Sequence, residues 1–182
     1  MKLLCAAVVL VSYACAQDHI GISAAQSACG PAQINFSATI DASQHPTPQP
    51  DPDKAVVFVV EDLGQCVDCA VNRLWIADVS GALVKVGADG SWMGATRGNS
   101  YLFFTVTPGE HHLCVNWQSR ISERAQAFAM SNLNAEAGKS YYFRARLFPG
   151  EADFSFDLDQ VNSDQGKYMV ASSPVSVSRQ KH

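Results

Sequence analysis

The cysteines are the residues with the clearest chemical potential in this sequence. Cys66 and Cys69 form a Cys-x-x-Cys pair, the spacing of many thiol–disulfide exchange sites. Such a site needs a thiolate that is stabilised by a nearby cation or by a helix N-terminus. Here Asp62 and Asp68 flank the pair, and their negative charge would raise the thiol pKa. We therefore keep thiol–disulfide chemistry as an alternative function, and expect no catalytic residue.

Disulfide bonds are the simpler role for the cysteines that follow residue 16: Cys29, Cys66, Cys69 and Cys114. An even number of cysteines in an exported chain favours a disulfide framework. Four cysteines allow three pairings, and the sequence alone does not choose among them. The pairing that we favour joins Cys29 to Cys114, which would tie an N-terminal extension to the sheet, and closes a short loop with Cys66 and Cys69.

Metal binding is a second alternative for the Cys-x-x-Cys pair. Zinc accepts two sulfur and two nitrogen ligands, which Cys66 and Cys69 could supply together with His111 and His112. The two histidines are adjacent on an expected strand, where neighbouring side chains point to opposite faces. Both rings cannot easily reach one ion, so we expect neither a metal nor another cofactor.

Two other groups of residues could bind a ligand. Tyr142, Arg144 and Arg146 share one face of an expected strand. The arginines could bind an anion there, or pair with aspartates of the following strand. A glycan-binding or small-ligand surface could instead use the tryptophans, although tryptophan is more often buried: Trp75, Trp92 and Trp117.

Residues 1–16 have the three parts of a secretory signal peptide. Lys2 gives a positive start, Leu3–Val11 is apolar, and small residues at 14 and 16 fit a cleavage site before Gln17. The apolar run is too short to span a bilayer, and we expect no membrane span elsewhere. An alternative is lipidation of Cys15, which would anchor the chain to a membrane. The expected location is the periplasm or the cell surface, with outer-membrane association if the chain is lipidated.

The composition of the chain and the placement of its prolines indicate one small β domain. The chain has 182 residues, of which 47% are hydrophobic and 16% charged, and its formal net charge is -4, which does not favour nucleic-acid binding. Residues 17–53 are expected to form an extension that ends in a Pro-rich connector, since a proline occupies every second position from 46 to 52. Residues 54–178 form the expected β domain, and residues 179–182 a frayed tail.

The domain itself contains short apolar or alternating segments separated by turn residues. Ala55–Val60 is an unbroken apolar run, as in a strand buried on both faces. Ser100–Thr107 alternates in polarity, and Asp89-Gly90 is typical of a hairpin turn. This pattern predicts an all-β sandwich of about seven to eight mostly antiparallel strands. One short C-terminal helix is expected over Gln165–Ser172, after a capping residue and before Pro174.

Several of these segments resemble a known family. Lys54–Glu61, the Pro108-Gly109-Glu110-His111 turn with the strands around it, and Ala135–Arg144 resemble the domain of unknown function 2846, over about residues 54–175. The turn is also similar to the PEGA-type surface domains, which are small β-sandwiches. The resemblance implies a small exported bacterial domain in the cell envelope, without known catalytic residues.

The sequence thus predicts a non-catalytic exported envelope domain that acts as a binding or structural accessory. Its expected partner is an envelope protein or a glycan. The alternatives are a thiol–disulfide active or metal-binding periplasmic protein that uses Cys66 and Cys69, and a glycan or small-ligand binding module.

Overall fold

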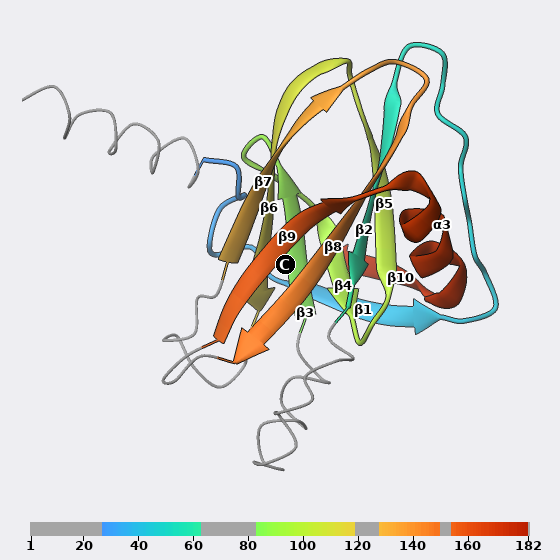
Figure 1. Cartoon of the computed structure of the whole chain (residues 1–182). Helices are drawn as coiled ribbons and strands as arrows, with labels where there is room; N and C mark the ends of the chain where they lie inside the picture. Colours follow the sequence, from blue (N-terminus) through green and yellow to red (C-terminus); the bar gives the residue numbers. More distant parts are fainter. Residues whose placement is uncertain (1–26, 63–82, 119–127, 150–153, 182) are drawn as a thin grey trace, which may run out of the picture.

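The computed structural model describes residues 27–62, 83–118, 128–149 and 154–181. These residues form ten strands and one helix, arranged as two packed sheets (Figure 1). Both cysteines of the Cys-x-x-Cys pair, the candidate ligand residue Trp75 and the candidate signal peptide lie outside the described residues. In the part of the chain that is described, no helix is both long enough and apolar enough to cross a membrane.

The larger sheet has six strands in the order β1-β10-β5-β2-β8-β9. Their bounds are Phe36–Asp41, Val175–Gln180, Tyr101–Val106, Ala55–Glu61, Ser140–Pro149 and Phe154–Val161. The smaller sheet has four strands in the order β4-β3-β6-β7, with bounds Ser91–Arg97, Leu83–Ala88, Gly109–Gln118 and Phe128–Ala135. Most pairings are antiparallel, and β10–β5 and β2–β8 are parallel. The predicted all-β sandwich is therefore confirmed.

The main core lies between the two sheets. Along each strand, every second side chain points toward the other sheet. These side chains form a continuous apolar cluster that includes Val57, Val86, Val115 and Phe143. Strands β5, β6 and β8 contribute Leu102, Leu113 and Ala145, among others, to this cluster. The Asp-Gly turn between β3 and β4 is also present, with Asp89 and Gly90 at positive φ.

A second core covers the outer face of the larger sheet. The helix α3 (Ser163–Ser172) begins after Asn162, whose side chain accepts a hydrogen bond from the Gln165 N–H. It packs on β2 and β8, where Phe58 and Tyr142 stack with their ring centroids 5.0 Å apart. Strand β2 is consequently buried on both faces, as its unbroken apolar run predicts.

Side chains join β1 and β10 to the smaller sheet, because no backbone ladder connects them. Ser178 Oγ accepts from the Ala95 N–H at 3.1 Å, and Ser176 Oγ donates to the Ala95 carbonyl at 2.8 Å, so two serines satisfy the free edge of β4. The Gln118 amide does the same for β1: it accepts from the Phe36 N–H at 2.7 Å and donates to its carbonyl at 2.8 Å. Polar side chains therefore close the sandwich where β1 and β10 lie against the smaller sheet.

The strand count exceeds the expected seven to eight because both ends of the described chain enter the larger sheet. Strand β1 lies in the extension, and β10 extends into the segment expected to be a frayed tail. The two strands pair with each other over six residue pairs. The Pro-rich connector then runs along the side of the domain from β1 to β2 (Figure 1), and the Tyr101 hydroxyl donates to the Pro46 carbonyl at 3.0 Å.

Candidate functional site

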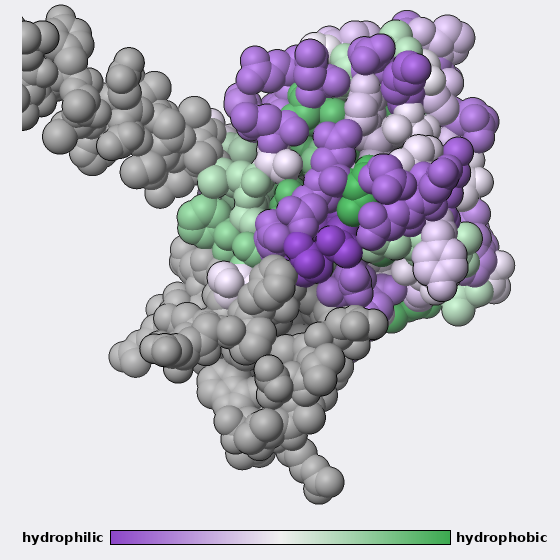
Figure 2. Space-filling view, in the orientation of Figure 1, coloured by the Kyte–Doolittle hydropathy of each residue, from purple (hydrophilic) through white to green (hydrophobic). Residues whose placement is uncertain are grey.

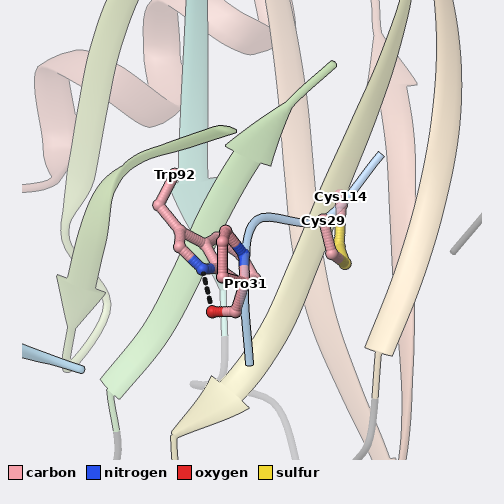
Figure 3. Close-up of a disulfide and its surroundings, with 4 residues drawn as sticks. All are labelled: Cys29, Pro31, Trp92 and Cys114. Atoms are coloured by element: carbon pink, nitrogen blue, oxygen red, sulfur yellow. Dashed lines mark hydrogen bonds between the residues drawn. A yellow bond between two sulfur atoms is a disulfide. The ribbon is translucent and has the colours of Figure 1, made fainter. Parts of the chain in front are cut away.

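Cys29 and Cys114 form a disulfide bond that ties the extension to β6 (Figure 3). Their Cα atoms are 5.2 Å apart, although 85 positions separate them in the sequence. Cys114 is fully buried and lies between two inward-facing residues of β6, so its side chain points out of the sandwich core. This confirms the favoured pairing of these two cysteines.

Residues 27–35, which include Cys29, form a strap across the outer face of the smaller sheet. Trp92 Nε1 donates to the Pro31 carbonyl at 2.9 Å (Figure 3). Gly30 lies so close to the Trp92 ring that a Cβ at this position would overlap it. Only glycine fits here, because the indole ring occupies the space that a side chain would need.

Lys85 holds the next part of the strap. Its Nζ donates to the Ile34 carbonyl at 3.2 Å and lies 4.4 Å from the centre of the Trp92 ring, a cation–π contact. Burial lowers the pKa of the Lys85 ammonium. A lysine inside an apolar strand gave no hint of this role, since its partners come from the extension and from another strand.

His111 and Asp89 form a second polar cluster, at the turn between β3 and β4. His111 Nδ1 lies 2.6 Å from Asp89 Oδ2, and His111 Nε2 lies 2.7 Å from the Thr107 carbonyl. The other Asp89 oxygen accepts from the His112 N–H at 2.9 Å. Both ring nitrogens of His111 therefore have partners within the protein. The ring stabilises the hairpin turn, and neither nitrogen is free to act as a base on a substrate.

The protonation of His111 should make stability depend on pH. Burial lowers its pKa, but hydrogen bonds to Asp89 and Thr107 and the Asp89 charge outweigh burial, so the pKa is raised above its ordinary value of 6.5. The stabilisation is present below that value and is lost as the pH rises through the raised pKa. We expect His111→Gln to cost about 1 kcal/mol at pH 5.5 and less at pH 8.5, measured by urea unfolding.

A double-mutant cycle with Asp89→Asn provides the control for this prediction. The coupling between the two substitutions should be larger at pH 5.5 than at pH 8.5, since the charged pair exists only below the His111 pKa. Equal coupling at both pH values would show that the two side chains interact only as neutral hydrogen-bonding groups.

The candidate ligand surface of Tyr142, Arg144 and Arg146 is divided by the fold. Tyr142 lies under α3, where Gly166 packs against its ring. Arg146 donates to Asp157 at 2.9 Å and also bonds Asp159, and Arg144 lies 3.6 Å from Asp159. Hydrophilic side chains gather over β8 and β9 (Figure 2), and the arginines there pair with aspartates of the neighbouring strand.

The other candidate residues are also placed by the structure. Trp117 is buried against Phe156, and Trp92 packs on the strap. His112 Nδ1 lies 2.8 Å from the Asn132 side chain, away from the partners of His111. Among the described residues, no three histidine, cysteine or acidic side chains gather as a metal site, and Cys66, Cys69, Trp75 and Cys15 lie outside them.

Another buried polar residue that the sequence did not single out is Glu61. Glu61 is the last residue of β2 and only 1% exposed. Burial raises the pKa of its carboxyl to about 7, against hydrogen bonds from Thr96 and from the Gly98 and Asn99 backbones, which lower it. Its position in β2 could have indicated this burial. Glu61 follows Ala55, Val57 and Val59 at every second position, so it lies on the same inward face.

Comparison with protein-family models, with curated proteins and with solved structures finds no match for this chain.

Proposed function

We propose that this protein is an exported, non-catalytic domain of the cell envelope that serves as a binding or structural accessory. The observation that carries the proposal is the Cys29–Cys114 disulfide. Structural disulfides persist in oxidising compartments such as the periplasm or the cell surface, and are rare where thiols are kept reduced. The secretory pattern of residues 1–16 supports the same location.

The polar clusters support an accessory role. Asp89 and His111 satisfy each other and the hairpin, and the arginines of β8 pair with the aspartates of β9. Lys85 stabilises the strap through Ile34 and Trp92. Each of these groups has a structural partner, which favours a scaffold whose outer surface contacts an envelope protein or a glycan.

The test is the intact mass of the protein from its native host, measured after denaturation and alkylation without a reductant. We expect a chain that begins at Gln17 and in which Cys29 and Cys114 take up no label. A lipid increment on Cys15 would make the protein a membrane-anchored form of the same accessory domain. Labelling of Cys29 and Cys114 in freshly isolated protein would contradict the proposal, because their disulfide would then be absent in the cell.

Peptide mapping of the same sample separates the alternatives for the remaining cysteines. Unlabelled Cys66 and Cys69 agree with a second structural disulfide. Labelled Cys66 and Cys69, with a pKa of either thiol well below the ordinary value of ~8.5, would favour thiol–disulfide chemistry over the proposed accessory role. A Cys29→Ala/Cys114→Ala variant serves as the matched control, since any label that it takes up must come from the Cys-x-x-Cys pair or from the leader.

A further inference from the structure

Glu61 lies where the two sheets of the sandwich meet. Its backbone belongs to β2 of the larger sheet, and its N–H donates to the Ser100 carbonyl at 2.9 Å. Its side chain reaches toward β4 of the smaller sheet, where Oε1 accepts from the Gly98 N–H at 3.2 Å. Gly98 and Asn99 form the tight turn that carries the chain from one sheet to the other, and both have positive φ. One carboxyl therefore holds the corner between the sheets.

The surroundings of this carboxyl favour its neutral form on geometric grounds. Oε2 is buried and has no hydrogen-bond partner among the described residues. The Thr96 hydroxyl lies beside both the carboxyl and the Val84 carbonyl, and it donates to Val84 at 3.4 Å. A hydroxyl has one proton, so it cannot donate to Val84 and to a carboxylate at once. A protonated Glu61 can instead donate to Thr96, which leaves the Val84 bond intact.

No cation among the described residues faces the carboxyl to compensate a negative charge. On β8, Arg144 and Arg146 point to the opposite side of the sheet and pair with aspartates of β9. Lys85 of β3 contacts the strap. The side chain of Arg97 on β4 is exposed, and the Tyr101 ring of β5 lies in the outer core. The other neighbours in the described core are apolar, apart from the uncharged Ser100 and the acidic Asp62 that follows in sequence.

We propose that Glu61 is a proton-controlled joint between the two sheets, closed when the carboxyl is neutral and weakened when it is ionised. In the closed form the neutral carboxyl accepts from the Gly98 N–H and its own proton is free to bond the Thr96 hydroxyl oxygen, so the turn between β4 and β5 is fixed. Ionisation leaves a buried charge with too few partners, which favours opening of the corner to water.

The direction of the pH dependence follows from linkage. The pKa of the carboxyl is about 7 in the closed form, and its ordinary value in an open, hydrated form is 4.5. The closed form binds the proton more tightly, so the opening equilibrium rises by up to about tenfold per pH unit between these values and levels off above the higher one. Opening at this corner should thus be rare at pH 5 and more than tenfold more frequent at pH 8.

Carboxyl NMR of the full chain, with ¹³C-labelled glutamate, tests the joint directly. The Glu61 signal should titrate near pH 7 and be missing from the spectrum of Glu61→Gln. A midpoint near the ordinary value would overturn the proposal. This measurement needs only the native protein, so it decides the matter even if the variant folds poorly.

Amide hydrogen exchange at Gly98 reports the opening itself, after correction for the intrinsic pH dependence of exchange. In the native protein, protection should fall more than tenfold between pH 5 and pH 8, and in Glu61→Gln it should be flat. Glu110→Gln, at an exposed position on β6, is the matched control and should behave as the native protein. Protection that changes equally in native protein and Glu61→Gln would contradict the proposal, and the local readout separates Glu61 from His111 at the β3–β4 turn.

Discussion

Replacing both cysteines in Cys29→Ala/Cys114→Ala should lower the free energy of unfolding by about 4 kcal/mol, because the bond closes a loop of 85 positions in the unfolded chain. This loss is a large part of the free energy of unfolding of an ordinary domain, which is roughly 5–15 kcal/mol. The strap would then keep its non-covalent contacts, which include those with Trp92, Lys85 and Gly90. Urea unfolding of the oxidised protein and of the variant gives the difference.

The reduced native protein is the control for this experiment. It keeps both thiols, so its stability should match that of the double variant to within about 1 kcal/mol if the covalent link itself carries the effect. A second control, Trp92→Phe, removes the hydrogen bond to Pro31 and leaves the disulfide in place; it should cost about 1 kcal/mol. If the double variant lost no more than Trp92→Phe, the disulfide would not be the main attachment of the strap.

Gly166→Ala should destabilise the protein by about 2 kcal/mol, although alanine is normally the better helix residue by about 1 kcal/mol. Gly166 lies in the second turn of α3 and is buried against Tyr142. A Cβ at this position would overlap the Tyr142 side chain, so the helix would have to move away from β8. Thermal or urea unfolding of the two proteins measures the loss.

A matched pair of variants separates helix propensity from the contact with Tyr142. Ala171→Gly, at an exposed position of the same helix, should cost about 1 kcal/mol through propensity alone. In a Tyr142→Ala background, Gly166→Ala should be neutral or stabilising, because the ring that it would overlap is gone. A gain in stability from Gly166→Ala in the native background would mean that α3 does not rest on Tyr142 as described.

Local patterns predicted several of the strands well. The unbroken run of β2, the alternation of β5 and the Asp89-Gly90 turn each specify a structure through neighbouring residues in the sequence. The helix near the C-terminus was also predicted, although it begins at Ser163 after the cap Asn162, two residues before the expected start. These signals are local, since side-chain periodicity and turn geometry are set within a few residues.

The order of the strands and the polar joints could not be predicted in this way. Strand β10 lies between β1 and β5, and Gln118 bonds Phe36 from a distance of 82 positions in the sequence. The environment of Glu61 depends on the turn at Gly98, which only the folded chain brings near it. Such contacts arise from tertiary packing between residues that are far apart in the chain, so no pattern among neighbouring residues predicts them. The Cys29–Cys114 pair was predictable only as one of three pairings.

The place of β10 in the larger sheet has a consequence for the order in which the chain can assemble. Strand β1 emerges first during synthesis, yet its backbone partner is the last strand of the protein. Strand β1 must therefore wait until nearly the whole chain has been made before its ladder can form. The Cys29–Cys114 link and the Gln118 amide involve residues made much earlier, so they can hold the first strand beside the domain until the last one arrives.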